Sequence, residues 1–482
     1  MDDDADEEGE GVAAGARTIH VVVFLLTLLA AACARQIAPT AIDPHLHSCQ
    51  TGRGVTAECG YVTVFEDRTA ARGRTIDVHF TVVRADLGGA REAVFPFAGG
   101  PGEGSTAMVG LAGGGLRSVR ATKDIVFVDQ RGTGQSHPLP CPSGAAEHPA
   151  AVFGHVFDPA VVLRCRDTLE RDADLTKYTT DLAVADVDDV RAALGYERVS
   201  LYGGSYGTRM AQAYLRRYPS RVRSVVLDGV VPFDSPIPLT YAASAQQSID
   251  RMFAGCAKDP DCHAAHPRPE ADLAAILRRL DAGGADATIH VQGAPVSVKV
   301  SRGDFAYALR GLLYGGGPPA RVLDLVGRAA ASGDLSEFAQ AYWSRERSFD
   351  GAIAYGQHFS IFCSEDIPFV SDRDIETGAA GTFLGRYLID QYRAACANWR
   401  RGPIAADART PVASNVPVLL VSGFFDPVTP PEFAERVART LPTSRTALSP
   451  TSGHGAAGAC ARTAVVYVLD RGTIDGMPSA CQ

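Results

Sequence analysis

The 482-residue chain lacks several features that would assign it to a common class of protein at once. Its 46 basic residues are outnumbered by 55 acidic ones, which argues against a dedicated nucleic-acid-binding protein, because such proteins usually carry a strong basic excess. It has no H-E-x-x-H pattern and no phosphate-binding P-loop, so neither of these motifs points to a bound metal or nucleotide. Its 49 glycines and 29 prolines are too few for a low-complexity chain, which carries roughly 25–30% of them.

The chain also lacks an apolar run of the ~20 residues that a membrane-spanning helix requires. The run that comes nearest, residues 21–33, fits instead the short apolar core of a secretory signal. We therefore assign residues 1–33 to a leader and expect an exported protein. Cys33 stands where a bacterial lipoprotein carries its lipidated cysteine, so a membrane tether through Cys33 and ordinary cleavage nearby both remain open.

Cysteine is present in an odd number, 11, and ten remain once Cys33 is set aside with the leader. In an exported protein, ten cysteines predict up to five disulfides. The sequence does not determine their connectivity, and pairing of neighbours along the chain is the simplest hypothesis. The pairs would then be Cys49–Cys59, Cys141–Cys165, Cys256–Cys262, Cys363–Cys396 and Cys460–Cys481. Two cysteine- and histidine-containing clusters, at 45–49 and 256–266, do not have common zinc spacing, so we expect no metal site.

The order of strand-like and helix-like segments predicts an α/β fold. Two alternating, β-branched runs lie within residues 57–84, and from residue 92 apolar strands alternate with amphipathic helices. This alternation predicts a mostly parallel sheet flanked by helices. It covers residues 50–232, stops over a helix-rich stretch at 233–400, and resumes at 401–482. The stretch at 233–400 is therefore predicted to be an inserted helical cap over the carboxyl ends of the strands, where ligands bind in such sheets.

A tight turn between a strand and a helix contains the candidate nucleophile. The segment Gly203-Gly-Ser-Tyr-Gly207 is a G-x-S-x-G motif between a strand that ends at Tyr202 and a helix that begins at Tyr206. In this context a nucleophile elbow exposes the serine hydroxyl, because glycines on each side allow the neighbouring backbone to approach. Ser205 is thus the predicted nucleophile.

A serine hydroxyl needs a base, and the base needs an orienting acid. In this kind of fold they follow the serine in the order acid, then histidine. Asp426 comes just after a late strand, and His454 lies in the loop after the next strand. We therefore predict Asp426 and His454 as the partners of Ser205, with Asp228, at the end of an earlier strand, as the competing acid.

Two backbone N–H groups should stabilise the negative oxygen that forms during attack. The Tyr206 N–H is one, because it follows the nucleophile. The other should come from the loop Gly99-Gly-Pro-Gly102 after the strand at 92–97, and both Gly99 and Gly100 are candidates.

These motifs together resemble the proline iminopeptidase branch of the α/β-hydrolases. The resemblance rests on Gly99–Gly102, the segment Asp129–Ser136, Gly203–Thr208, Asp426 and His454. It is nearest to the secreted tripeptidyl-aminopeptidase-like subgroup, which has a large, cysteine-containing cap. It implies an α/β-hydrolase fold and a serine exopeptidase that acts at a free peptide N-terminus without metal or cofactor. Iminopeptidases commonly have His before Gly-Gly-Pro-Gly, whereas this chain has Ala98.

An aminopeptidase must bind a cationic N-terminus, which calls for an acid in the cap. Glu365 and Asp366 are the candidates, because the related subgroup carries a similar acidic segment beside a cysteine. We therefore expect an exported aminopeptidase, tripeptidyl or prolyl, that uses Ser205, His454 and Asp426. A carboxylesterase with the same three residues is the alternative, and a non-catalytic binding protein on a hydrolase fold is a third hypothesis. The expected partner is a peptide or small ester substrate, and not a nucleic acid.

Overall fold

The computed structural model describes residues 44–51, 54–141, 149–316, 319–456 and 460–479. The leader predicted at 1–33, including Cys33, lies outside these residues. In the described part of the chain, no helix combines the length and the apolar character that crossing a membrane requires.

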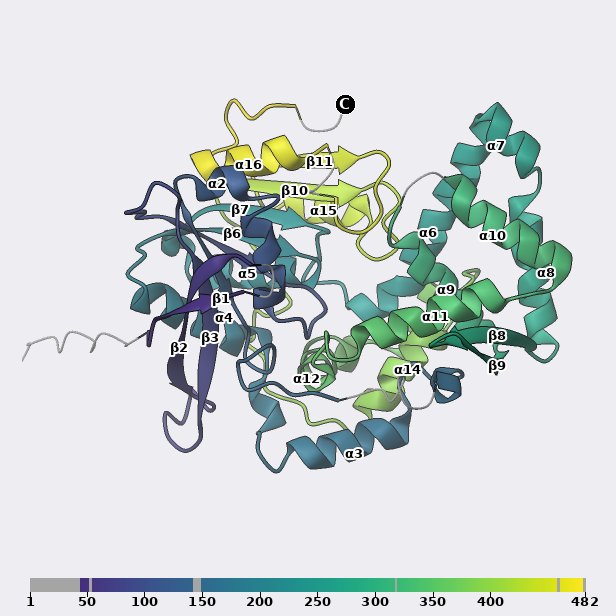
Figure 1. Ribbon diagram of the computed structural model, residues 1–482, viewed down its shortest axis with the longest axis horizontal. Coiled ribbons are helices and arrows are strands. Elements are labelled where there is room, and N and C mark those ends of the chain that lie inside the picture. The colour runs from purple at the N-terminus through teal and green to yellow at the C-terminus, as the bar shows by residue number, and fades with distance from the viewer. Residues whose placement is uncertain (1–43, 52–53, 142–148, 317–318, 457–459, 480–482) are drawn as a thin grey trace, which may run out of the picture. The chain divides into compact units, whose positions relative to one another are not determined.

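Nine strands in the described residues form one sheet with the order β1-β2-β3-β5-β4-β6-β7-β10-β11 (Figure 1). The strands are β1 (His47–Gln50), β2 (Thr56–Phe65), β3 (Thr75–Val83), β4 (Ala93–Phe97), β5 (Asp124–Val128), β6 (Val199–Gly204), β7 (Val222–Asp228), β10 (Val418–Gly423) and β11 (Ser444–Ser449). β1, β2 and β3 pair antiparallel, and β3 is antiparallel to β5. All other pairs are parallel, which confirms the mostly parallel sheet.

Helices cover both faces of this sheet, which is why β4, β5 and β10 are apolar and wholly buried. On one face, α4 (Thr180–Ala193), α5 (Tyr206–Arg217) and α15 (Pro431–Ala438) pack their apolar sides against the strands. On the other face, the 3₁₀ segment η1 (Ser105–Ala112), α2 (Arg117–Arg120) and α16 (Arg462–Arg471) do the same. The helix predicted to begin at Tyr206 thus corresponds to α5.

The insertion between β7 and β10 forms the cap. It contains α6 (Ile237–Lys258), α7 (Pro260–Ala265), α8 (Pro269–Asp281), β8 (Ala285–Val291), β9 (Ala294–Val300), α9 (Arg302–Leu313), α10 (Pro319–Ser332), α11 (Ser336–Phe349), α12 (Tyr355–Glu365), α13 (Asp372–Ala379) and α14 (Tyr387–Cys396). The carboxyl ends of β10 and β11 point toward it (Figure 1).

The helix-rich cap also contains two strands, because β8 and β9 form an antiparallel hairpin inside it. The two strands meet at Gln292 and Gly293, whose φ angles of 52° and 86° suit a tight two-residue hairpin turn. Ala287 and Ile289 face inward in alternation along β8, which is the period-2 pattern of a strand.

The boundary predicted at residue 233 lies between the core and the cap, but one buried hydrophobic cluster contains residues from both sides of it. Apolar residues from the 139–178 segment, which precedes the predicted cap, belong to the same buried cluster as the cap helices. Phe157, for example, packs edge-on against Phe359 of α12 and Tyr392 of α14. Residues 43–482 accordingly cluster as a single unit.

Four disulfides join Cys49 to Cys59, Cys141 to Cys165, Cys256 to Cys262, and Cys363 to Cys396. These are four of the five neighbour pairs that the simplest hypothesis predicts. Cys481, the partner predicted for Cys460, lies outside the described residues.

Candidate active site

Ser205 sits at a sharp turn between β6 and α5, with φ 54° and ψ −123°. A positive φ is strained for a residue with a side chain and is retained where the surrounding structure enforces it. The turn is tight enough that a Cβ on Gly203 would collide with the Gly207 carbonyl, and one on Gly207 would collide with the Phe97 carbonyl. Both flanking glycines are therefore required by close packing, as the nucleophile-elbow prediction expects.

His454 and Asp426 meet beside this turn. The Nδ1 atom of His454 lies 2.8 Å from Oδ2 of Asp426, and Asp426 is completely buried. Asp426 also accepts hydrogen bonds from the backbone N–H groups of Val428 and Thr429 and from the Thr429 hydroxyl, at 2.8, 2.9 and 2.7 Å. These donors fix the carboxylate in the orientation that meets the imidazole.

Burial and charge act in opposite directions on this pair. Burial alone would lower the pKa of His454, but the Asp426 carboxylate raises it above its usual value. Burial alone would raise the pKa of Asp426, but the charge of His454 and the hydrogen bonds hold it below its usual value. The pair therefore favours an imidazole that accepts a proton readily and an aspartate that stays ionised.

Asp228, the competing acid, has a different set of partners. Its Oδ2 accepts a hydrogen bond from the Tyr202 hydroxyl at 3.0 Å, and its Oδ1 accepts one from the backbone N–H of Ala456 at 2.8 Å. Asp228 thus connects β6 to the segment just after His454, while its charge adds to the rise in the pKa of His454.

The loop Gly99–Gly102 lies against the nucleophile. A Cβ on Gly99 would stand 3.1 Å from Cβ of Ser205 and 3.6 Å from its Oγ, so a side chain there would crowd the hydroxyl. Gly100 has φ +100°, which favours glycine. Gly99 and Gly100 are thus placed beside Ser205, as the sequence predicts, and Tyr206 begins α5 directly after it.

The cap holds this loop from outside. The backbone N–H of Ala354 donates to the Gly102 carbonyl at 2.9 Å, and Nδ1 of His358 lies 2.8 Å from the Pro101 carbonyl. Burial lowers the pKa of His358 to about 4, so its ring is neutral. Because a carbonyl can only accept, Nδ1 carries the proton, and Nε2 accepts from the Tyr392 hydroxyl at 3.0 Å.

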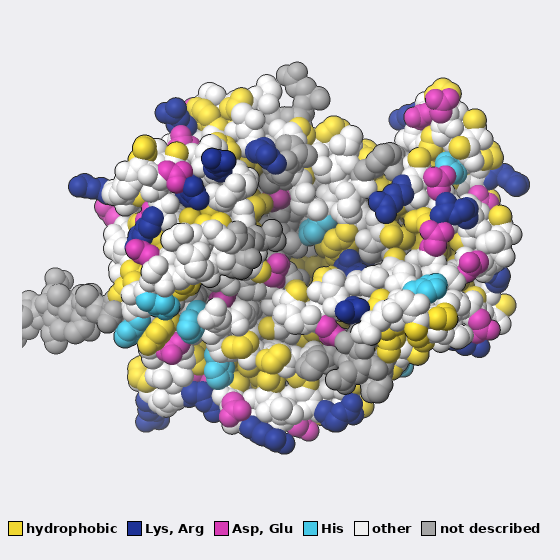
Figure 2. All heavy atoms as spheres, viewed as in Figure 1, with side chains coloured by type: hydrophobic (Ala, Val, Ile, Leu, Met, Phe, Trp, Pro, Cys, Tyr) yellow, Lys and Arg dark blue, Asp and Glu magenta, His cyan; other side chains and the backbone are white. Residues whose placement is uncertain are grey.

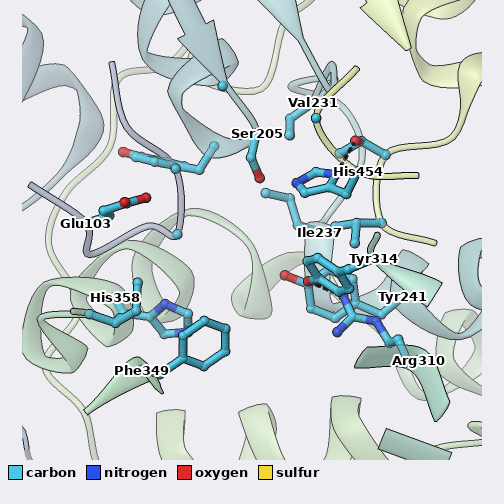
Figure 3. Close-up of a pocket in the computed structure, with 18 of the residues that line it drawn as sticks. Glu103, Ser205, Val231, Ile237, Tyr241, Arg310, Tyr314, Phe349, His358 and His454 are labelled. Carbon is cyan, nitrogen blue, oxygen red and sulfur yellow. Dashed lines mark hydrogen bonds between the residues drawn. The ribbon is translucent and has the colours of Figure 1, made fainter. Parts of the chain in front are cut away.

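Ser205, His454, Gly99, Gly100 and Tyr206 line one cavity of about 410 Å³ between the core and the cap. Figure 2 shows the hollow on this face, with histidine and charged side chains visible in it. In Figure 3 the Ser205 hydroxyl points toward the His454 ring. Most of the remaining lining is aromatic or aliphatic.

Two family models match the chain. One described as alpha/beta hydrolase fold matches residues 116–266, which include Ser205. One described as TAP-like protein matches residues 381–481, which include Asp426 and His454. The sheet order, the turn at Ser205 and these matches agree. The chain has the α/β-hydrolase fold.

Named relatives of this α/β-hydrolase include peptidases. Serine protease Hip1 of Mycobacterium tuberculosis is 33% identical over 181 residues, which are 34% of this chain and 35% of that protein. Tripeptidyl aminopeptidase of Streptomyces lividans is 31% identical over 229 residues, which are 42% of this chain and 40% of that protein. The aligned parts thus span less than half of each of these two relatives. A proline iminopeptidase structure from Mycobacterium smegmatis covers 86% of this chain and 98% of its own, at 16% identity and a TM-score of 0.39.

Glu365 and Asp366, predicted to bind the substrate, do not line the cavity of the α/β-hydrolase. The Asp366 carboxylate is fully buried against the Arg209 guanidinium, with oxygen–nitrogen distances of 2.7 and 3.1 Å. The Glu365 carboxylate accepts from the N–H and the hydroxyl of Thr180, both at 2.7 Å. That hydroxyl lies 2.8 Å from the Tyr206 hydroxyl. The two acids connect the cap to α4 and α5, because helix α12 ends over the core rather than over the cavity.

Besides Asp228, which the sequence analysis named, three charged residues line the cavity that the sequence did not point to, namely Glu103, Arg310 and Arg345. Glu103 could have been found, because it directly follows the Gly99–Gly102 loop. Arg310 stands in the otherwise apolar run Phe305-Ala-Tyr-Ala-Leu-Arg-Gly-Leu-Leu313, where a charge is unexpected. Arg345 had no local signal, because its neighbours in the sequence are also charged.

The metal-like cluster at 256–266 is accounted for by other contacts. Cys256 and Cys262 form a disulfide, and His266 Nε2 lies 3.0 Å from an Asp324 carboxylate oxygen. Within the described ranges, no three histidine, cysteine or acidic side chains come together in a way that could hold a metal ion.

Proposed function

We propose that this chain is a serine hydrolase that cleaves peptide bonds near the free N-terminus of peptides. The observation that carries the proposal is the 2.8 Å contact of His454 with buried Asp426, in the cavity that Ser205 also lines. In this proposal the Ser205 Oγ attacks the substrate carbonyl carbon while Nε2 of His454 takes the hydroxyl proton. His454 then gives that proton to the leaving amine, and an acyl-enzyme forms. Water, activated by His454, releases the acyl group and restores Ser205.

The contacts of Asp426 support its role as the orienting acid. By accepting from Nδ1–H, it keeps Nε2 unprotonated and directed toward the serine. Its ionised state also stabilises the imidazolium that forms during attack. Three further donors hold the carboxylate, so it need not reorient as the charge develops.

The proposed oxyanion donors are the N–H group of Tyr206 and one N–H group of the loop Gly99–Gly102. Gly99 and Gly100 both line the cavity with Ser205, so either can supply the second donor. Each such donor contributes about 3 kcal/mol to stabilising the transition state.

Glu103 is the acid that we propose for the substrate's ammonium group, in place of Glu365 and Asp366. It lines the cavity with Ser205, and it directly follows the loop whose Gly99 packs on Ser205. An α-ammonium group is one carbon from the carbonyl of the first residue, so an acid close to the nucleophile suits a free N-terminus. Burial raises the pKa of Glu103, and an incoming ammonium group would counter this by stabilising the ionised form.

Assays of the full chain and of Ser205→Ala on matched substrates test the proposal. The set should contain aminoacyl and tripeptidyl amides, the same amides with a blocked N-terminus, and short acyl esters. We expect Ser205-dependent cleavage of the free amides and at least about tenfold slower cleavage of the blocked ones. Cleavage of esters alone would instead indicate a carboxylesterase. Absence of Ser205-dependent turnover on all three would overturn the proposal.

Glu103→Gln should raise KM for free-amine substrates and leave the blocked ones little changed. Glu435→Gln is the matched control, because Glu435 is an exposed acid on α15, outside the cavity. An equal loss on free and blocked substrates would argue against Glu103 as the ammonium-binding residue.

We further propose that the protein is exported. Four disulfides support this, because such bonds persist in oxidising compartments and are rare in the cytosol. Fractionation of cells and mass spectrometry of the mature N-terminus would test the location, the cleavage site and a lipid on Cys33 together. A protein that retains residues 1–33 inside the cell would contradict export.

A further inference from the structure

Two arginines from neighbouring cap helices form one wall of the cavity. Arg310 lies on α9 and Arg345 on α11, and these helices pack together. Both residues line the cavity with Ser205 and His454. Arg310 is only 2% exposed. The wall therefore brings strongly basic groups into an otherwise apolar and aromatic part of the lining.

The two guanidinium groups converge on Tyr314. The guanidinium carbon of Arg310 lies 5.2 Å from the centre of the Tyr314 ring, and that of Arg345 lies 4.2 Å from it. Nη2 of Arg310 donates to the Tyr314 hydroxyl at 3.1 Å, and the charge of Arg345 also acts on Tyr314. Burial alone would raise the pKa of Tyr314, but the two cations lower it to about 8. Arg310 further stacks on Tyr241, at 4.1 Å.

No carboxylate among the described residues forms an ion pair with Arg310 or Arg345. The Nε atoms of both are buried and without a hydrogen-bond partner. Glu346 is the acid whose charge acts on Arg345, but burial raises the pKa of Glu346 to about 7, and its Oε1 has no hydrogen-bond partner. A buried cation without a counter-ion is costly and is normally paired. Both guanidinium groups therefore still have donors with which to bind an anion.

This place adjoins the reacting groups. The Tyr314 ring packs edge-on against the His454 ring, with centres 5.3 Å apart. Figure 3 shows Arg310 and Tyr314 on one side of the cavity and Glu103 on the other, with Ser205 and His454 above them. The two sides carry opposite charges, so a substrate with an ammonium group and a carboxylate would be oriented across the cavity.

We propose that Arg310 and Arg345 form a subsite that binds a carboxylate of the substrate. Guanidinium groups suit this task, because their planar donors can hold both oxygens of a carboxylate. The proposal rests on the proposed function, since it names the substrate class that the same cavity prefers. The carboxylate can come from an acidic side chain beside the scissile bond or from the C-terminus of a short peptide.

Steady-state assays of the full chain can separate these two sources. The first arm compares glutamyl with glutaminyl amides, which differ only in the side-chain charge. The second arm compares tripeptides that end in a free carboxylate with the same peptides ending in an amide. We expect kcat/KM to be about 10- to 100-fold higher for the carboxylate member of one arm. The arm that shows this preference identifies the source.

Arg345→Gln should reduce that preference to about threefold or less. Arg345→Lys, which retains a charge but has no planar fork, should keep an intermediate preference. Arg347→Gln is the matched control, because Arg347 lies two residues along α11, is exposed and does not line the cavity. Absence of a preference in the unmodified chain, or an undiminished preference in Arg345→Gln and Arg345→Lys, would overturn the subsite.

A binding measurement distinguishes failure of the subsite from failure of the proposed function. Glutarate can be titrated calorimetrically into the Ser205→Ala protein, which requires no turnover. We expect saturable binding that weakens about tenfold or more in Ser205→Ala/Arg345→Gln but not in Ser205→Ala/Arg347→Gln. Glutarate binding without hydrolysis of any amide would retain the subsite and reject the peptidase. Hydrolysis without a carboxylate preference, together with no glutarate binding, would reject the subsite alone.

Discussion

The arginines of the core and those of the cap have different kinds of partner, carboxylates in the core and aromatic rings in the cap. In the core, Arg131 is completely buried and bonds Asp186 through two contacts, at 2.6 and 2.8 Å. Arg209 on α5 is paired in the same manner with Asp366 of the cap. Each of these two buried guanidinium groups thus has a carboxylate beside it.

In the cap, Arg310 and Arg345, which form one wall of the cavity, stack on aromatic rings instead. We call these two residues the cap wall. Aromatic faces attract a cation but do not neutralise it. The role of an arginine in this protein therefore depends on its partners and not on burial alone. The paired arginines hold loops and join the two regions, whereas the unpaired ones retain their capacity to bind an anion.

The largest effect is expected on kcat when Asp426, the core carboxylate that contacts His454, is replaced. Asp426→Asn should lower kcat by about 10⁴-fold, because an amide in place of the carboxylate favours the wrong histidine tautomer. The measurement is kcat on a free aminoacyl amide, with circular dichroism to confirm an unchanged fold. Glu435→Gln, on the neighbouring helix α15, should leave kcat unaffected. A loss of less than tenfold in Asp426→Asn would contradict its role.

The next effect concerns the buried pair that joins core and cap. Asp366→Ala leaves Arg209 buried without its partner, so the free energy of unfolding should fall by about 3–5 kcal/mol. Urea denaturation with the disulfides intact measures this. Asp372→Ala, which removes the acid of the exposed pair with Arg393, should cause no measurable change.

A double variant sharpens that result. Arg209→Met combined with Asp366→Ala should recover much of the lost stability, because no unpaired charge is then left in the interior. If the double variant is as unstable as the sum of both single variants, packing rather than charge holds this contact.

Replacement of His358, a neutral residue of the cap, should lower kcat less than Asp426→Asn does. His358→Phe removes the donor to the Pro101 carbonyl while keeping an aromatic ring, so the oxyanion loop loses one of its supports. We expect kcat to fall about tenfold with KM nearly unchanged, because the loop stabilises charge that forms only in the transition state. His358→Gln, which can donate again, should recover part of kcat. A change in KM alone would indicate a substrate contact instead.

The charge on Asp426 should also be visible in the pH dependence. His454 acts as a base only when neutral, and its raised pKa keeps it protonated to a higher pH than an ordinary histidine. Inactivation by a sulfonyl fluoride should therefore slow as pH falls, about tenfold per pH unit, along a limb whose pKa lies above 6.5. This reagent has no amino group that could titrate in the same range. A limb at or below 6.5 would contradict the predicted shift.

The smallest effect on stability is expected in the cap wall. Arg345→Met should change the free energy of unfolding by less than about 1 kcal/mol, because the lost ring contacts are offset by removing a half-buried charge that has no carboxylate partner. Urea denaturation beside Asp366→Ala gives the direct comparison. A loss of about 3 kcal/mol or more would show that Arg345 has a counter-ion within the fold, which would remove the contrast between the two regions.

Much of the core was predictable because its signals are local. A strand, a glycine turn and a helix around Ser205 follow each other within about 20 residues. Asp426 and His454 could be placed because each follows a strand, and the carboxyl ends of parallel strands meet at one edge of a sheet.

The cap was less predictable because its chemistry depends on packing between distant segments. Glu365 and Asp366 have the composition of an exposed acidic site, yet the end of α12 packs them against α4 and α5. Arg310 and Arg345 come together only because α9 and α11 lie side by side. No sequence pattern within α9 or α11 predicts that the two arginines lie close together.

The loop that carries His454 is attached to the cap as well as to the sheet. The His454 N–H donates to the Tyr314 carbonyl at 2.8 Å, and Gly316 forms a bridge with Ser452. A Cβ on Gly316 would collide with Gly453. Anyone grafting a foreign cap onto this scaffold to change its substrate range would consequently have to retain the stretch from 313 to 316. Without that stretch, the loop would lose two of its contacts, and His454, the proposed general base, would be misplaced.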